Sequence, residues 1–254
     1  MAQDQIRRFF RVLDSAWGPQ NWWPADSPLE MIVGAFLTQN TAWTNVEKAL
    51  HNLRSANALS LAALRMIALP DLEQLIRPAG YFRQKSSRVK LFVGFVDNRY
   101  GGSLDRMFAE PTAKLRGELL ALKGVGPETA DSILLYAANH EVFVVDAYTR
   151  RIAERHGLLS ADADYEEVRH LFESALTPLL ENQAATAEQP AIPTEKRREP
   201  THPPSSLSAA SRSSAAQLFN EMHALIVEVG KNYCRKSEPA CGQCPLGKFL
   251  VPSE

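Results

Sequence analysis

The sequence predicts an all-α protein, and three observations support this. Apolar residues recur at helical spacing through most of the chain, strand signals are minimal, and most connections between the periodic segments are short. Amphipathic helices with short connections bury their apolar stripes against one another, so the chain should fold as packed helices. Its 254 residues, 45% of them hydrophobic, are enough for one large or two small cores.

The helices can be placed in order along the chain. The first is expected over residues 4–17. The second starts at Ser27, where Ser-Pro-Leu-Glu forms a capping box with proline just inside the helix. Later helices are expected over residues 43–56, 60–68, 70–77, 83–98, 111–122, 127–138, 147–157, 163–180 and 214–232.

A glycine turn joins two of these helices. The apolar pattern of residues 111–122 ends at Lys123-Gly124-Val125-Gly126, and the next helix opens at Pro127, where a missing N–H costs nothing. Glycine permits positive φ and close approach of a ligand, and the free N–H groups at the helix start favour a phosphate. A Gly-x-Gly turn on its own also fits an ordinary corner between two helices.

A lone acid follows a short β-branched run. Residues Val142 to Val145 lead directly to Asp146, which precedes the helix expected over 147–157. Aspartate is a favoured N-cap, which is one explanation of this residue. The other is catalysis, since a carboxylate can stabilise positive charge that develops on a sugar and can orient the attacking water.

Together, the turn and the acid resemble the helix-hairpin-helix DNA glycosylase superfamily, which includes endonuclease III. The matching patterns are Leu-x-Gly-Val-Gly-x-x-Thr-Ala from Leu122 and Val-Val-Asp-x-x-x-x-Arg around Asp146. The resemblance implies an all-α fold of two lobes with an active-site cleft between them, in which Asp146 assists rupture of the N-glycosidic bond. The hairpin residues that would grip the DNA backbone are Lys123, Gly124, Val125, Gly126 and Thr129.

One departure from the family pattern bears on the reaction type. Members that also cut the strand carry a lysine at the position of Glu128, and its amine forms a Schiff base with the sugar. A carboxylate cannot form an imine, so the resemblance implies a monofunctional glycosylase that leaves an abasic site. A glutamate near the start of a helix also has a structural explanation, favourable interaction with the helix dipole.

Two elements in the N-terminal third narrow the resemblance. They are Trp22-Trp23-Pro24 and Leu37-Thr38-Gln39-Asn40-Thr41, and they are similar to those of the 3-methyladenine DNA glycosylase III branch of the superfamily. The similarity covers roughly residues 1–182 and 215–232.

That branch implies a role for each matching position. Gln39 would fill the gap left by a flipped base. The base pocket would be formed by Trp22, Trp23, Pro24, Trp43 and Lys231. An alkylated purine carries positive charge, so electron-rich aromatic faces favour it over the neutral base. The tryptophans could instead be buried core, Gln39 a helix-end amide, and Lys231 a surface lysine.

The expected domain organisation follows from these matches. Residues 25–157 would form the hairpin lobe with the base pocket and Asp146. Residues 1–24, 158–182 and 215–232 would form a second helical lobe. Residues 183–214 are rich in Pro, Ser, Ala and Thr, so we expect a flexible insert there, because such a segment cannot bury enough apolar surface to offset ordering. Residues 233–254 would form a Cys-rich C-terminal loop.

All three cysteines fall in this loop. Cys234-x6-Cys241-x2-Cys244 matches part of a Cys-x6-Cys-x2-Cys-x5-Cys pattern that ligates a [4Fe–4S] cluster in many relatives, but Leu250 stands at the fourth place. Three alternatives remain. A cluster could bind with a non-cysteine fourth ligand or an open iron, the loop could be a remnant without metal, or zinc could bind through three thiolates and another group.

Charge and composition limit the partners. The net charge is −1, which is not the signature of a nonspecific nucleic-acid binder, although one expected helix carries Arg83, Lys85, Arg88 and Lys90. These side chains could be an ordinary solvated face or part of a DNA footprint. No signal peptide or membrane span is expected. We expect a cytoplasmic monomer, associated with the nucleoid if bacterial, that acts on damaged double-stranded DNA.

Three function classes compete. The leading one is a monofunctional glycosylase that excises alkylated purines such as 3-methyladenine. The second is an endonuclease III-like glycosylase and lyase on oxidised pyrimidines, against which Glu128 and the tryptophans argue. The third is a catalytically silent DNA-binding module that uses only the hairpin, against which Asp146 argues.

Overall fold

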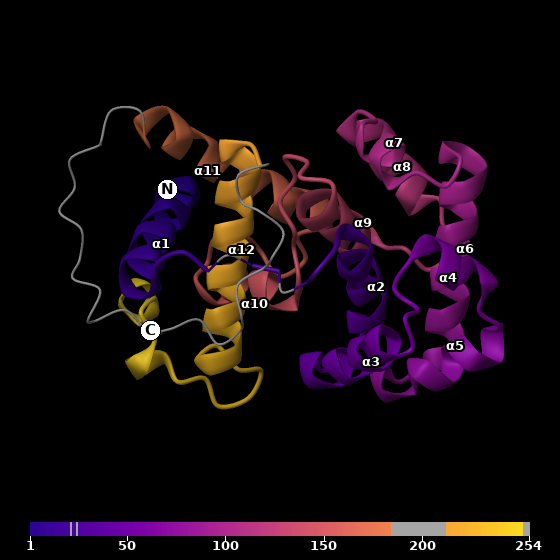
Figure 1. Cartoon of the computed structure of the whole chain (residues 1–254). Coiled ribbons are helices and arrows are strands. Elements are labelled where there is room, and N and C mark those ends of the chain that lie inside the picture. Colours follow the sequence, from indigo (N-terminus) through magenta and orange to yellow (C-terminus); the bar gives the residue numbers. More distant parts are fainter. Residues whose placement is uncertain (21, 24, 184–211, 251–254) are drawn as a thin grey trace. The chain divides into compact units, whose positions relative to one another are not determined.

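The computed structural model (Figure 1) describes residues 1–20, 22–23, 25–183 and 212–250. These residues form helices and connecting loops without a β-strand, which confirms the predicted all-α class. None of the helices in these ranges is long and apolar enough to cross a membrane. Pro24, most of the expected insert (residues 184–211) and residues 251–254 lie outside this description.

The chain divides into two compact units. The central unit comprises Ala25–His140, and the terminal unit comprises Met1–Pro24 and Glu141–Glu254. The expected boundary at residue 157 therefore moves to residue 140, and Asp146 belongs to the terminal unit. The reason is packing, because α10 (Ala147–Arg155) lies against α12 (Ser214–Asn232), both in the terminal unit.

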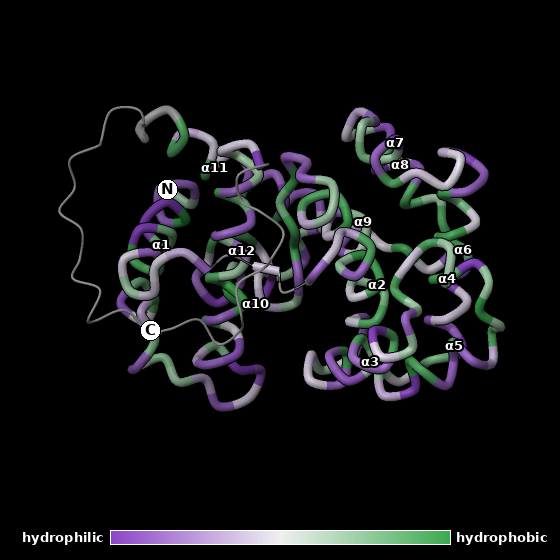
Figure 2. The backbone as a smooth tube through the Cα atoms, viewed as in Figure 1, coloured by the Kyte–Doolittle hydropathy of each residue, from purple (hydrophilic) through white to green (hydrophobic). Residues whose placement is uncertain are grey.

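The central unit is built around α2 (Pro28–Thr38). Every residue from Leu29 to Leu37 is buried, so this helix is covered on all sides, and Figure 2 shows the hydrophobic residues along it. Ser27 caps its start by accepting a hydrogen bond from the Glu30 N–H at 3.1 Å, as the capping-box motif predicts. The other helices of this unit are α3 (Trp43–Ser55), α4 (Leu61–Met66), α5 (Leu69–Leu75), α6 (Phe82–Tyr100), α7 (Leu104–Phe108), α8 (Thr112–Leu120) and α9 (Pro127–Ser132), with a short 3-10 turn η1 (Arg77–Ala79).

The predicted hairpin joins α8 to α9. Gly124 has a φ of 84°, which an L side chain rarely adopts, whereas Gly126 is extended with a φ of −95°. The helix expected over 127–138 is not uniform, because α9 passes into a π-helical turn, η2 (Ile133–Ala137). The Ala138 N–H donates to the Ile133 carbonyl at 3.1 Å, five residues back, which marks a wider turn than an α-helix has.

The terminal unit packs α1 (Ala2–Trp17) and α11 (Tyr165–Gln183) with α10 and α12. The apolar stripe of α1 buries Ile6, Phe9, Leu13 and Trp17. Nearly every residue of α12 from Ala216 to Gly230 is buried, and this helix lies beside α1 and α10 (Figure 1). Because α12 is surrounded, its polar side chains contact other protein groups and not solvent.

Candidate functional site

Asp146 occupies the N-cap of α10. Its Oδ1 accepts hydrogen bonds from the Thr149 backbone N–H at 2.7 Å and from Thr149 Oγ1 at 2.9 Å. Aspartate suits this place because its carboxylate satisfies a helix N–H that has no intrahelical partner and favours the positive end of the helix dipole. One oxygen is therefore committed to the helix, and Oδ2 is left for other contacts.

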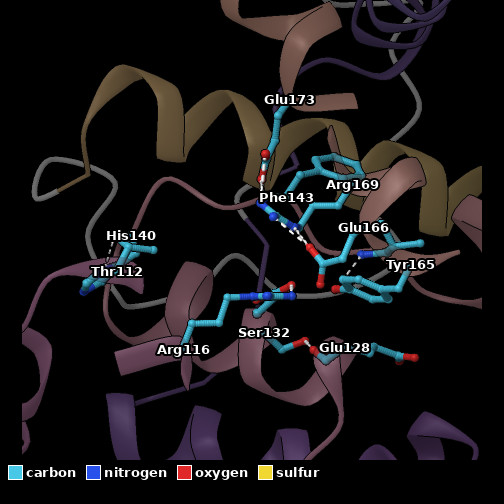
Figure 3. A network of polar contacts seen from close by, with 12 residues as sticks. Thr112, Arg116, Glu128, Ser132, His140, Phe143, Tyr165, Glu166, Arg169 and Glu173 are labelled. Carbon is cyan, nitrogen blue, oxygen red and sulfur yellow. Dashed lines mark hydrogen bonds and ion pairs between the residues drawn. The ribbon is translucent and has the colours of Figure 1, made fainter. Parts of the chain in front are cut away.

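The segment that leads to Asp146 is fixed by side chains of α11. Glu173 accepts a hydrogen bond from the Phe143 N–H at 2.9 Å, and Tyr165 Oη accepts one from the Val145 N–H at 3.3 Å. Arg169 binds Glu173 at 2.7 Å and holds that carboxylate in place (Figure 3). These bonds replace the partners that a sheet would provide, so the β-branched run stays extended without forming a strand.

His223 approaches the other oxygen of Asp146 from α12. Its Nε2 lies 3.6 Å from Asp146 Oδ2, and the side chains are 5% and 14% exposed, respectively. Burial by itself would raise the pKa of Asp146. The contacts with His223 and then with Thr149 outweigh it, so the pKa of this carboxyl lies below its usual range. Asp146 is therefore ionised at neutral pH, as a residue that stabilises a cationic transition state needs to be.

Three of the predicted pocket residues are described in the same unit as Asp146. Trp22 and Trp23 are 4% and 7% exposed, and their ring centroids lie 5.5 Å apart. Lys231 Nζ lies 5.1 Å from the centroid of the Trp22 ring. Asn220 Nδ2 donates to the Trp22 carbonyl at 2.6 Å and so ties this segment to α12. Lys231 and Trp22 are brought together as the sequence pattern implied, and their role in a base pocket stays a prediction.

Two residues of this site were missed from the sequence, namely Asn220 and His223. They lie one turn apart on an otherwise mostly apolar stretch of α12, and both are buried. Polar side chains one turn apart in such a stretch are a recognisable signal, because burying them unpaired is costly.

In the central unit, Gln39 is bonded to the hairpin. Its Nε2 donates to the Gly124 carbonyl at 3.1 Å and to Thr129 Oγ1 at 2.9 Å. Arg88 Nη1 donates to Gln39 Oε1, and a Cβ on Gly124 would overlap the Arg88 side chain. The amide of Gln39 is thus held from both ends, and the structure brings together three of the predicted DNA-contact residues. Arg88 completes this cluster, and its guanidinium needs the space that only glycine leaves.

Lys85 does not belong to a solvated basic face. It is 1% exposed, and its Nζ donates to the Leu37 carbonyl, the Ala79 carbonyl and Thr41 Oγ1 at 2.8, 2.8 and 2.6 Å. Burial, and secondarily Arg88, lowers the pKa of Lys85 to about 8. Three acceptors match the three protons of the ammonium group. The suggestion that Lys85 adds to a DNA footprint is therefore wrong, and this lysine instead holds the loop that carries Gln39.

The remaining predicted residues of the central unit lie on or near its surface. Lys123, Gly124 and Gly126 are exposed, while Val125 is buried under the turn. Trp43 is half-buried, and its Nε1 donates to Glu47 Oε1 at 2.8 Å. Trp43 belongs to the central unit, whereas Trp22 and Trp23 belong to the terminal unit.

The three cysteines line one small cavity of about 20 Å³, together with His156 and Leu250. Arg155 holds the surrounding loop, since its guanidinium donates to Cys234 Sγ at 3.3 Å and to the Arg235 carbonyl at 2.7 Å. Within the described ranges, no three Cys, His, Asp or Glu side chains are arranged to hold a metal ion. Leu250 supplies an apolar wall where a fourth thiolate would stand, so these residues do not fit a four-thiolate cluster.

Comparisons with known proteins agree with this geometry. The sequence model of the "HhH-GPD superfamily base excision DNA repair protein" matches residues 33–178. A protein of Methanocaldococcus jannaschii named "Putative DNA repair glycosylase MJ1434" is 37% identical over 249 residues, which cover 98% of this chain and 96% of that protein. Endonuclease III of Thermotoga maritima is 24% identical over 97% of this chain and 88% of its own length.

A solved structure of a DNA glycosylase is also similar to this chain. The H. pylori 3-methyladenine DNA glycosylase MagIII, bound to 1,N6-ethenoadenine, aligns with a TM-score of 0.70 and 30% identity. The alignment covers 91% of this chain and 97% of that chain.

Proposed function

The chain belongs to the HhH-GPD superfamily of base excision DNA repair proteins and is a DNA glycosylase, and we propose that it hydrolyses the N-glycosidic bond of alkylated purines in double-stranded DNA. The observation that carries this proposal is the ionised, rigidly held carboxylate of Asp146 at the N-cap of α10. A monofunctional reaction of this kind needs one carboxylate and a water molecule, and no covalent attachment to the protein.

The chemistry follows from the charge that develops during base release. As the bond from the sugar to the base breaks, the sugar becomes oxocarbenium-like and gains positive charge. Asp146 stabilises that charge and orients or deprotonates the attacking water, which adds to the anomeric carbon. An alkylated purine leaves readily because it is already cationic, so no second acid is required to protonate it.

Glu128 supports the monofunctional outcome. It stands at the family position of the Schiff-base lysine and is exposed in the first turn of α9. Since a carboxylate cannot form an imine, we expect an intact strand with an abasic site after base release. Borohydride reduction during the reaction should trap no protein–DNA adduct. A trapped adduct would contradict this part of the proposal unless substitution of another lysine abolished it.

The aromatic residues support the substrate class. The family pattern assigns Trp22, Trp23 and Trp43 to the base pocket, and tryptophan attracts a cationic base more strongly than a neutral one. The MagIII protein, 30% identical to this chain, has been solved with an adenine adduct bound. Both points favour modified purines over the oxidised pyrimidines of the endonuclease III alternative.

The hairpin cluster supports engagement of duplex DNA. A flipped nucleotide leaves a gap in the stack, and a side chain that fills the gap must be presented in a fixed conformation. The bonds of Gln39 to Gly124, Thr129 and Arg88 provide such pre-organisation within the central unit. We propose that this unit grips the DNA of a damaged duplex and that the protein acts as a monomer.

We also propose that the cysteine cavity holds no [4Fe–4S] cluster in the active protein. The donor set supports this, because Leu250 replaces the fourth thiolate and Arg155 already bonds the loop through Cys234 Sγ and neighbouring carbonyls. The role of the cysteine loop would then be to close the terminal unit around α12.

The decisive experiment identifies the free bases that the protein releases. Chemically methylated duplex DNA and a duplex with thymine glycol are incubated with wild type and with Asp146→Asn, and the released bases are identified by mass spectrometry. We expect methylated purines from the first substrate and nothing from the second. Release of oxidised pyrimidines alone would support the endonuclease III alternative.

The Asp146→Asn variant is a sharp control. Asparagine is as good an N-cap as aspartate, so α10 should stay folded while the charge is lost. We expect single-turnover base release to fall about a hundredfold or more, with binding of undamaged duplex retained. Equal activity in both proteins would rule out Asp146 as the catalytic carboxylate.

A further inference from the structure

A buried histidine of α12 contacts the carboxylate to which the proposed function assigns the chemistry. His223 Nε2 lies 3.6 Å from Asp146 Oδ2. This separation is longer than a direct hydrogen bond and within the range of an ion pair. The two residues are 77 positions apart in the sequence, so the packing of α10 on α12 creates the contact.

The two side chains differ in their exposed fraction, and this difference distinguishes their roles. The Asp146 side chain is 14% exposed and that of His223 only 5%. The ring of His223 also packs edge-on against Phe143, with centroids 6.2 Å apart. The acid is thus the member of the pair that a sugar or water can reach, and the histidine lies behind it. A reversed pair, with the histidine as the base and the acid as its support, would need the opposite order.

The two oxygens of Asp146 are held by different elements. Thr149 binds Oδ1 through two hydrogen bonds from within α10, at 2.7 and 2.9 Å. His223 faces Oδ2 from α12. With contacts at one oxygen only, the carboxylate could rotate, and burial would destabilise its ionised form without a compensating contact at Oδ2. With contacts at both, its orientation and its charge are set together.

We propose that His223 is the positioning residue of the glycosylase reaction and holds Asp146 Oδ2 in a fixed orientation for the sugar. The proposal rests on the proposed function, in which Asp146 is the catalytic carboxylate. His223 itself does not touch the substrate, so its effect passes through Asp146.

Other charged groups near the pair have their own contacts. On α10, Arg151 lies 5.0 Å from the centroid of the Tyr148 ring, and the pKa of Tyr148 is raised by burial and by Asp146. On α12, Glu221 and Glu228 are buried carboxylates that would raise the pKa of Asp146 if they acted on it at all. Among the described neighbours, His223 is the group that most strongly lowers that pKa.

The test compares His223→Phe with His223→Gln. Phenylalanine keeps a ring against Phe143 but offers no donor, and glutamine keeps a donor without the imidazole ring. Without His223, the pKa of Asp146 should rise, so protonation should abolish activity at higher pH. We expect the acid limb of the single-turnover rate to move up by about one pH unit in His223→Phe. It should move less in His223→Gln.

A matched control is His156→Phe. His156 is also a buried histidine of the terminal unit, with its ring 4.8 Å from that of Phe9, and it is not among the groups that shift the pKa of Asp146. This substitution should leave the acid limb where it is in wild type, whatever its effect on the melting temperature. A purely structural role of His223 would make the two variants behave alike and would overturn the proposal.

A second measurement does not depend on activity. The pKa of the Asp146 carboxyl is measured by carbon-13 NMR in free wild type and in the folded His223 variants, and a higher value is expected in the variants. If neither variant folds, the imidazole signals of wild-type His223 should shift as Asp146 titrates, and should not in Asp146→Asn. Absence of that coupling would refute the inference. Failure of wild type to release any base would instead refute the proposed function.

Discussion

Lys85 shows how one residue can support a functional loop from behind. The sequence around it is basic, with arginines two residues before and three residues after it. Its ammonium group is nevertheless buried and contacts the last turn of α2, the loop that follows α2 and the turn η1. It donates to two backbone carbonyls, and the Ala79 carbonyl also accepts a hydrogen bond from Thr41 Oγ1 at 2.6 Å. Thr41, which also binds Lys85, lies two residues from Gln39. The conformation of Gln39 therefore depends on a lysine that cannot reach the DNA.

Replacement of Lys85 by methionine should be destabilising. The side chain fills a similar volume but donates no hydrogen bond, so we expect the free energy of unfolding to fall by about 2–4 kcal/mol. Denaturant titration followed by circular dichroism measures this. Lys114→Met is the control, since Lys114 is exposed and pairs with Glu110 one turn away; its effect should stay within about 0.5 kcal/mol. Similar losses in the two variants would contradict the buried network.

Leu250 gives a second prediction for a single residue. If the missing thiolate is what keeps the cavity free of a cluster, Leu250→Cys should allow one to form. Anaerobic reconstitution with iron and sulfide should give visible iron–sulfur absorbance and bound iron in Leu250→Cys, with neither in wild type. Stoichiometric cluster in wild type would show that three cysteines suffice and would overturn the metal-free proposal.

At the scale of elements, α12 is the helix that organises the terminal unit. One turn of it presents Asn220 and His223 to the Trp22 carbonyl and to Asp146, and its later part packs on α10. At Gly230 the two helices approach each other closely, since a Cβ there would overlap the ring of Tyr148. The site thus depends on two helices meeting at a residue without a side chain.

Gly230 in α12 and Gly94 in α6 lie in helices of equal length. Replacing each by alanine distinguishes the effect of packing on stability from that of helix propensity. Gly230→Ala should destabilise the protein by about 1–3 kcal/mol, because Tyr148 must move and α10 with it. Gly94→Ala in α6 should stabilise by about 0.5–1 kcal/mol, because nothing lies within 4 Å of the added methyl group. Thermal unfolding of the two variants checks this, and the same sign of effect in both would contradict the packing described here.

Elements that depend on local patterns were predicted well. The capping box at Ser27, the hairpin at Gly124 and the long helices lie where periodicity and caps place them. The five-residue α7 was missed because it is too short to show a period, and the π turn after Ser132 was missed because its wider bonds are set by packing. His223 was missed because its partner is distant in sequence. Asp146 as the catalytic residue came from the family pattern and stays a prediction until base release is measured.

At the scale of the whole molecule, the two units differ in how the chain builds them. The central unit is one continuous segment, 25–140, whereas the terminal unit combines segments from both ends of the chain. The central unit has its own core around α2 and holds the Gln39 cluster internally. The terminal unit needs α1, whose buried stripe packs on α11 and α12.

This difference predicts how fragments of the protein behave. Residues 25–140 expressed alone should give a helical spectrum and one cooperative thermal transition, because α3, α6 and α9, which pack on α2, lie in that segment. Residues 141–254 alone should lack such a transition, since Ile6, Phe9 and Leu13 of α1 are missing from the core. Joining residues 1–24 to 141–254 through a flexible linker should restore it. A cooperative transition in 141–254 without α1 would show that the packing of the terminal unit does not depend on its N-terminal helix.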